Sequence, residues 1–316
     1  MIVVAGESLI DLIYGPKGTG TVLASPGGGP FNAARTIARL GRPTRFLGRL
    51  STDPFGQLLA ARLAADKVEM AAPEQLTEPT ALAIITVSGT GVPQYWFHLA
   101  DTATFALDLP TAESAITADT EALHIGSIGL AVEPMATALE CLVRNLPPSV
   151  LLVLDPNWRA RAIPDADAHR SRIRRLLPRT DVLKVSTEDL AFVVPGSDVT
   201  EAAEILLGWG ARCVLVTDGP DPVRAFTRDL EVSVPVPPVT VVDTVGAGDA
   251  LGGGFIAWWT EHRLTRDQLA DARLLRAGLR AAAEIAVITC GRAGADPPWR
   301  HELNAAEWRG GPAVYA

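Results

Sequence analysis

The second half of the chain alternates short apolar segments with segments of helical periodicity. Strands are predicted at 123–127, 150–154, 182–185 and 213–216, and a helix at 134–145 lies between the first two. This alternation is typical of a parallel sheet whose strands are connected by right-handed crossovers. We therefore expect an α/β fold with a mostly parallel central sheet covered by helices.

Polar residues follow several of these predicted strands. In a doubly wound sheet, ligands bind at the edge formed by the carboxyl ends of the strands. The residues expected at this edge are Asp155, Asn157, Arg159, Lys184, Ser186, Glu188, Thr217 and Gly219. The sequence therefore predicts a ligand site there.

The stretch 239–254 predicts a strand, a glycine turn and a buried helix. Residues 239–242 are all β-branched, which indicates a short buried strand. The turn Gly246-Ala247-Gly248 would aim free backbone N–H groups and the positive end of the helix dipole at one point, which suits a phosphate. A carboxylate beside that anion, Asp249, fits a base that takes a proton from a hydroxyl attacking phosphorus.

Each part of this stretch also has a simpler interpretation. An aspartate in the first turn of a helix is often a cap or a dipole partner, and glycines often serve only a turn. A dinucleotide fingerprint is excluded by spacing, because the next glycine after Gly248 is Gly252, one residue late for G-x-G-x-x-G. The sequence contains no P-loop either.

The composition is that of an ordinary globular protein, with 48% hydrophobic and 20% charged residues and a formal net charge of −8. The negative charge argues against a nucleic-acid or anionic-membrane partner. No apolar run approaches the length of a membrane span, and the N-terminus lacks the features of a signal peptide. The widely spaced Cys141, Cys213 and Cys290 indicate buried thiols in a reducing compartment, so we expect a cytoplasmic protein.

Two motifs together resemble the ribokinase-like (PfkB) carbohydrate kinase family. The string Asp243-Thr-Val-Gly-Ala-Gly-Asp249 resembles its C-terminal signature, and Gly27-Gly28 followed by Asn32 at a helix start resembles its N-terminal signature. The resemblance runs from Gly6 to about Pro298. It implies that Asp249 is the general base, that the amides of Gly246, Ala247 and Gly248 form an anion hole, and that Asp11 binds a sugar hydroxyl.

The resemblance also implies a fold and its division. We expect a ribokinase-like three-layer α/β/α sandwich over residues 1–300, a small β-sheet lid from about 12–24 and 82–106, and a tail at 301–316. Residues 82–88 and 93–98 predict two of the lid strands. Tyr95 and Phe97 share a face there and either line the sugar site or pack on a second subunit. A homodimer through the lid would use an apolar sheet face.

ATP and Mg²⁺ are the implied nucleotide and metal. The ATP-binding residues would be Lys184, Ser186, Thr217 and Gly219, with Arg159 as a mobile cation in the substrate site or else a surface ion-pair partner. The family often holds Mg²⁺ near an Asn-x-x-Glu motif. This chain has Ser186-Thr-Glu-Asp189, so Glu188 and Asp189 are both candidates, acting through water. The backbone of Asp243 and Val245 would bind K⁺.

Several stretches resemble bacterial fructokinases, among them residues 48–56, 155–159 and 288–298. One lid segment departs from that pattern, because Asp101-Thr-Ala-Thr-Phe105 stands where many fructokinases carry Gly-Thr-Ala-Asp-Arg. We therefore expect an ATP-dependent kinase of a primary sugar hydroxyl, with fructose as the first candidate. The alternatives are 2-keto-3-deoxygluconate, ribose or a nucleoside as substrate, or a non-catalytic sugar or nucleotide sensor.

Overall fold

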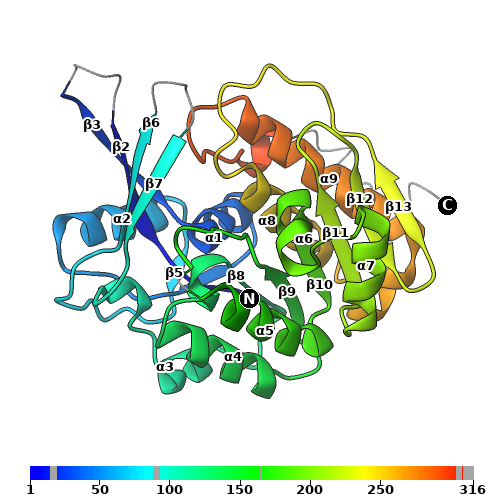
Figure 1. Ribbon diagram of the computed structural model, residues 1–316, viewed down its shortest axis with the longest axis horizontal. Helices are drawn as coiled ribbons and strands as arrows, with labels where there is room; N and C mark the ends of the chain where they lie inside the picture. Colours follow the sequence, from blue (N-terminus) through cyan, green and yellow to red (C-terminus); the bar gives the residue numbers. More distant parts are fainter. Residues whose placement is uncertain (15–19, 88–92, 164, 304–307, 309–316) are drawn as a thin grey trace.

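The computed structural model describes residues 1–14, 20–87, 93–163, 165–303 and 308 of the 316-residue chain. Its central sheet has nine strands in the order β13-β12-β11-β10-β9-β8-β1-β4-β5 (Figure 1). The strands from β11 to β5 are parallel neighbours, and β12 and β13 add an antiparallel edge. Their bounds are β1 Ile2–Ala5, β4 Thr44–Leu47, β5 Glu69–Met70, β8 Ala122–Gly126, β9 Leu151–Asp155, β10 Val182–Ser186, β11 Cys213–Thr217, β12 Val223–Thr227 and β13 Glu231–Val234.

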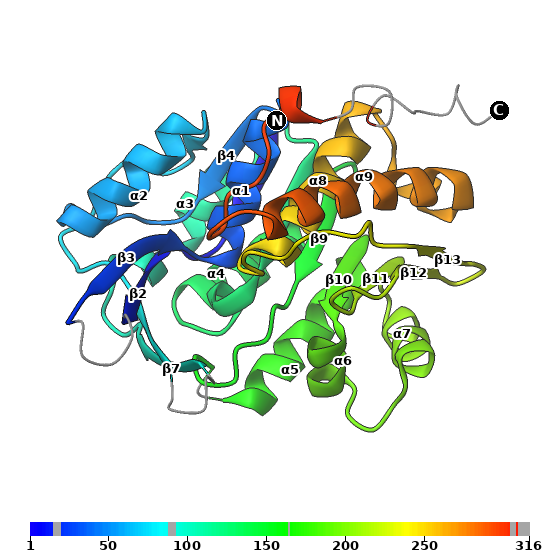
Figure 2. The ribbon, with the colours of Figure 1, turned by 90° about the horizontal axis from the view of Figure 1, so that it is seen from above.

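Helices cover both faces of this sheet (Figure 2). One face carries α1 (Gly29–Arg39), α2 (Pro54–Ala65), α8 (Ala247–Glu261) and α9 (Ala272–Cys290). The other carries α3 (Leu109–Ser114), α4 (Met135–Asn145), α5 (Ala166–Leu176), α6 (Thr187–Val193) and α7 (Val199–Gly208). β1, β8 and β9 are buried along their whole length. Because helices cover both faces of these strands, their sequences are continuous apolar runs. The expected α/β/α arrangement is confirmed.

A second, four-stranded sheet has the order β3-β2-β6-β7. It consists of β2 (Leu9–Tyr14), β3 (Val22–Gly27), β6 (Leu82–Val87) and β7 (Pro93–His98), so the strands predicted near 82–88 and 93–98 are present. Asp11 lies opposite Ala83, and Ala83 lies opposite Phe97. Because residues directly opposite each other share a face, Asp11 and Phe97 point to the same side of this sheet.

The strand predicted at 239–242 is wrong. These residues form a loop, and the side chains of Val239, Val241 and Val242 are 39%, 58% and 61% exposed. The N–H groups of Val242 and Asp243 both donate to the carbonyl of Cys290 at the end of α9. β-Branched residues favour a strand only where a neighbouring strand and a packed face exist, and this stretch has neither.

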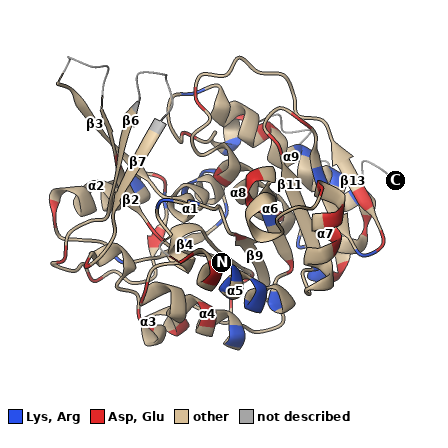
Figure 3. Ribbon diagram, in the orientation of Figure 1, with Lys and Arg blue, Asp and Glu red and all other residues tan. Residues whose placement is uncertain are grey.

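Acidic and basic residues alternate along the ribbon, with basic ones gathered on α5 (Figure 3). Two of these, Arg172 and Arg175, pair with Glu140 of α4. Trp308, in the segment predicted as a tail, is buried, and its carbonyl accepts a hydrogen bond from Trp258 of α8. Within the ranges that the structure describes, no helix combines the length and the apolar character needed to cross a membrane.

Candidate active site

The first turn of α8 is built on a left-handed glycine. Gly246 has φ +77°, and a Cβ at this position would come within 2.5 Å of the Ala295 side chain. Glycine adopts this conformation without steric cost, so the chain can turn directly into the helix. Ala247 donates its N–H to Thr244, whereas the N–H groups of Gly248 and Asp249 find no backbone acceptor among the described residues. Two free amides therefore point outward at the positive end of α8.

Asp249 lies directly at this turn and is only 9% exposed. Its Oδ2 accepts a hydrogen bond from Asn32 Nδ2 at 2.9 Å, and its Oδ1 accepts one from Asn157 Nδ2 at 3.4 Å. Burial raises the pKa of Asp249, while the Asn32 hydrogen bond and the charges of Lys184 and Arg159 oppose that rise. A buried carboxylate with a raised pKa is a stronger proton acceptor than an exposed one, as a general base requires.

Asn32 and Asn157 reach Asp249 from two different elements. Asn32 stands in the first turns of α1, which begins at Gly29 after the glycine pair of the N-terminal motif. Asn157 follows the carboxyl end of β9 and has φ +43°, a left-handed conformation that asparagine tolerates better than most residues. The sequence placed Asn157 at the ligand edge but gave no sign that it would contact Asp249.

Asp11 lies on the small sheet and is brought toward Asp249. Burial raises its pKa to about 6, with the Asp249 charge adding to the rise and Arg159 opposing it. A Cβ at Gly27, on the adjacent β3, would collide with the Asp11 carboxylate. Glycine at this position therefore leaves room for the Asp11 carboxyl group beside β3.

Arg159 is exposed just beyond β9, where its guanidinium donates to the carbonyl of Trp158. Its charge acts on both Asp11 and Asp249. The preceding residue is firmly held, since the Trp158 N–H donates to Asp189 Oδ1 at 2.6 Å and its ring stacks on Phe192. Within the part of the chain that the structure describes, Arg159 forms no ion pair, so its cation at the end of this loop is available to an anionic ligand.

Lys184 and Asp155 form a buried ion pair beneath the α8 turn. Lys184 is 4% exposed, and its Nζ lies 2.9 Å from Asp155 Oδ2. The same Nζ lies 2.9 Å from the point where a Cβ on Gly248 would stand. Lys184 therefore lies beneath the free amides and away from the surface. Its charge would act on a nucleotide across the first turn of α8 and not by direct contact.

Ser186 and Asp189 form a capping box at the start of α6. Asp189 Oδ2 accepts from both the N–H and the Oγ of Ser186 at 2.7 Å, and its other oxygen binds Trp158, whereas Glu188 is exposed. Thr217 lies beside Ser186 in register, and Gly219 follows it with φ +51°. The described parts of the chain hold no cluster of three or more His, Cys, Asp or Glu residues arranged around a metal position.

Asp243 organises the loop that leads into α8. Its Oδ1 accepts from the Val245 N–H at 3.1 Å, and its Oδ2 accepts from the Gly294 N–H at 2.9 Å. These bonds tie the loop before the anion-binding turn to the segment after α9.

Two buried groups near the site were missed by the sequence analysis. Glu7, at the carboxyl end of β1, is 1% exposed, accepts from the Gly129 N–H at 2.8 Å and interacts electrostatically with Asp249. His124, on β8, is 2% exposed, and burial together with the Lys184 charge lowers its pKa to about 3. Glu7 follows a buried strand just as Asp155 does, and that position could have indicated it.

Tyr95 and Phe97 stack on each other on β7, with ring centroids 6.2 Å apart. Phe97 shares the Asp11 face of the small sheet and lines a hollow of about 430 Å³ together with Arg161 and Ala162. This hollow adjoins the side of the sheet that carries Asp11.

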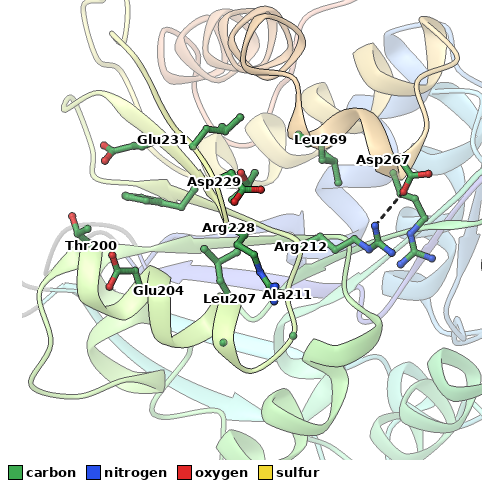
Figure 4. Close-up of a pocket in the computed structure, with 17 residues that line it drawn as sticks. Thr200, Glu204, Leu207, Ala211, Arg212, Arg228, Asp229, Glu231, Asp267 and Leu269 are labelled. Carbon is green, nitrogen blue, oxygen red and sulfur yellow. Dashed lines mark hydrogen bonds and ion pairs between the residues drawn. The ribbon is translucent and has the colours of Figure 1, made fainter.

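A larger hollow, of about 800 Å³, lies elsewhere, between α7, the β12–β13 turn and residues 266–270 (Figure 4). Two of the three arginines that line it form ion pairs: Arg212 binds Asp267, and Arg266 binds Asp181. None of the predicted site residues lines it. The chemistry therefore concentrates at the carboxyl edge of the sheet, not in this hollow.

The chain belongs to the pfkB family of carbohydrate kinases, because residues 1–302 match the model of that family, described as "pfkB family carbohydrate kinase". It is thus a carbohydrate phosphotransferase with an alcohol group as acceptor. The resemblance read from the two glycine motifs is confirmed.

Curated relatives include a fructokinase of Rhizobium leguminosarum bv. trifolii, 34% identical over 88% of this chain and 86% of that protein. A fructokinase of Klebsiella pneumoniae is 32% identical over 82% and 84% of the two chains. Among solved structures, Xylella fastidiosa fructokinase with bound ATP has a TM-score of 0.82 at 26% identity, covering 93% of each chain. Vibrio cholerae O395 fructokinase with fructose, ADP and calcium has a TM-score of 0.80 at 25% identity, covering 93% and 94%. The predicted ribokinase-like fold is confirmed.

Proposed function

We propose that this protein is a fructokinase, which transfers the γ-phosphoryl group of ATP to a primary hydroxyl of fructose. The observation that carries the proposal is the buried Asp249 carboxylate beside two free amides at the start of α8, held by Asn32 and Asn157. The names of the relatives support fructose as the first substrate to test.

The reaction assigns one task to each group. Asp249 accepts the proton of the sugar hydroxyl while the hydroxyl oxygen bonds to the γ-phosphorus of ATP. The bond between the γ-phosphorus and the β,γ-bridging oxygen breaks, and ADP is released. The amides of Gly248 and Asp249, with the dipole of α8, stabilise charge on the transferred group. Arg159, whose charge acts on both Asp11 and Asp249, supplies a cation, and Asp11 orients the sugar by accepting hydrogen bonds from its hydroxyls.

ATP would lie along the edge formed by the ends of β10 and β11, next to Ser186, Thr217 and Gly219. Mg²⁺ would neutralise charge on the phosphates and keep most of its water ligands. Of the two candidates near it, Glu188 has its carboxylate in solvent, whereas both oxygens of Asp189 are bonded within the protein. Glu188 is therefore our first choice for a contact through water.

A K⁺ ion would bind backbone carbonyls of Asp243 and Val245, in the loop that precedes the anion-binding turn. The hydrogen bond from the Gly294 N–H to Asp243 ties that loop to the segment after α9. A cation bound to the same loop would restrict it further and so stiffen the start of α8. One solved structure of Vibrio cholerae O395 fructokinase holds fructose, ADP and a potassium ion.

In the segment 101–105, which departs from many fructokinases, Asp101 is exposed and residues 102–105 are buried. Thr104 Oγ1 donates to the carbonyl of Ser8 and accepts from the N–H of Ala81, and Phe105 is 2% exposed. The segment therefore joins the starts of β2 and β6 to the body. Its altered side chains act on the sugar by setting how the small sheet stands over the pocket.

The test is ATP consumption by the purified protein with Mg²⁺ and K⁺ against fructose, 2-keto-3-deoxygluconate, ribose, tagatose and adenosine, with a no-sugar blank. We expect a fructose-dependent rate well above the blank and above the other acceptors. A faster rate with another acceptor would retain the chemistry but reject fructose. ATP binding without turnover of any acceptor would favour the sensor interpretation.

A further inference from the structure

The chain contains three lysines, Lys17, Lys67 and Lys184. Lys184 is buried, and its ammonium group lies close to both Asp155 and the first turn of α8. Asp155 Oδ2 is 2.9 Å from Lys184 Nζ, and the Cβ position of Gly248 is also 2.9 Å from it. The pair is therefore oriented, with its positive end toward the first turn of α8.

The surroundings of this ammonium group are strongly acidic. Interacting carboxyl groups face the site from β1, β2, β9, α6 and α8, while the cations facing it are Lys184 and the exposed Arg159. The neutral imidazole of His124 lies close by on β8. Asp155, Asp189 and Asp249 interact with the Lys184 charge, and Glu7 and Asp11 interact with Asp249. A site so acidic would repel both the phosphates of a nucleotide and a further ionised carboxylate.

We propose that Lys184 is a positioning residue that keeps Asp249 in its ionised, proton-accepting form by placing a buried positive charge under the first turn of α8. This inference rests on the proposed function, in which Asp249 is the base. A charge in this interior position is poorly screened by water or salt, so it acts on Asp249 more strongly than a surface lysine would. Asp155 supports it because an unpaired buried ammonium would be costly.

Two single variants are expected to move the pH profile in opposite directions. The quantity to measure is kcat at saturating sugar and MgATP, whose acidic limb reports the ionisation of the base in the bound complex. Lys184→Met removes the positive charge, so the acidic limb should move to higher pH by about one unit or more. Asp155→Asn leaves the lysine uncompensated, so the limb should move to lower pH.

The matched control is Lys67→Met, which makes the same chemical change at an exposed lysine after α2. Its acidic limb should coincide with that of the wild type. If Lys184→Met alone does not fold, the double variant Lys184→Met/Asp155→Leu carries the test. Replacing both partners of a buried pair by apolar groups is often close to neutral for folding. The acidic limb of the double variant should also move to higher pH, but by less than in Lys184→Met. Both charges are removed, and the lysine charge has the larger effect because it lies nearer to α8 than Asp155 does.

The outcomes separate this inference from the proposed function. An unmoved acidic limb in folded Lys184→Met or the double variant, or movement of the same sign in Lys184→Met and Asp155→Asn, would overturn the positioning role. If Asp249→Asn retains its turnover, the general base itself is wrong and the proposed function fails. A merely structural role for Lys184 would lower the thermal midpoint and the rate without shifting the limb.

Discussion

Asp249 owes its chemistry to its surroundings, since burial raises the pKa of its carboxylate while the Asn32 hydrogen bond and the charges of Lys184 and Arg159 oppose that rise. Asp249→Asn keeps the shape and removes the base. We expect kcat to fall at least about 100-fold, because general bases contribute on that scale, with ATP affinity nearly unchanged. Steady-state kinetics and nucleotide titration check this. The control is Asp229→Asn, an exposed carboxylate on the far side of the sheet, which should leave kcat unchanged.

Asp11 links substrate binding to pH. Its pKa is about 6, so the ligand-free protein carries a protonated Asp11 below that pH and a carboxylate above it. We expect the KM for the sugar to rise as the pH falls through about 6, because the carboxylate is the better hydrogen-bond acceptor for hydroxyls. In Asp11→Asn this pH dependence should vanish and KM should rise about tenfold or more. An unchanged KM would remove Asp11 from the sugar site.

Asp11→Asn is also expected to change the stability of the ligand-free protein, in a direction that the raised pKa of Asp11 determines. A carboxyl group whose folded-state pKa lies above its unfolded value of 3.8 favours the folded protein less as the pH rises from about 3.8 through 6. At pH 7 the buried Asp11 charge therefore destabilises the ligand-free protein. Asp11→Asn should raise the midpoint of thermal unfolding at pH 7 while it weakens sugar binding, and the difference should shrink toward pH 4.

At the scale of elements, the start of α8 depends on one left-handed glycine. Gly246→Ala would strain the backbone by about 1–2 kcal/mol and press a methyl group against Ala295. We expect both a lower thermal midpoint and a large loss of kcat, since the amides of Gly248 and Asp249 would be displaced. The control is Gly196→Ala, where φ is +89° but the added methyl meets open space. It should lose stability with kcat intact, and equal kcat losses in both variants would contradict the prediction.

Element types were predictable where a strand and its partners leave a local pattern. The parallel strands of the second half are continuous buried apolar runs, and the helix cap at Ser186 is visible as Ser-x-x-Asp. The β-branched residues at 239–242 gave the same local signal, yet no strand pairs with them. Whether residues 239–242 pair with another strand depends on where β13 and α9 lie in the fold. The local sequence pattern carries no information about those positions. Asn157 and Glu7 were likewise out of reach as partners of Asp249, because their contacts depend on tertiary packing.

At the scale of the whole molecule, the small sheet presents two different faces. Asp11 on one face interacts with Asp249, and the opposite face carries Tyr14 paired with Val22, and Trp96 paired with Ile84. Tyr14, Val22 and Trp96 are 49%, 44% and 46% exposed. An exposed apolar sheet face of this kind favours association with a second copy. We therefore expect a homodimer in which the outer faces of two small sheets pack together, with each pocket left open to its own substrate.

Light scattering after gel filtration should then give twice the 33.4 kDa mass of one chain. Trp96→Glu places a charge in the middle of the proposed contact, where its desolvation would be costly, so the dimer should dissociate into folded monomers. Leu23→Glu is the matched control: Leu23 is 61% exposed on the same sheet, but its pairing with Ile13 places it on the Asp11 face. This variant should remain dimeric. A monomeric wild type would rule out the contact, and loss of the dimer in both variants would show that the sheet itself, rather than its outer face, is required.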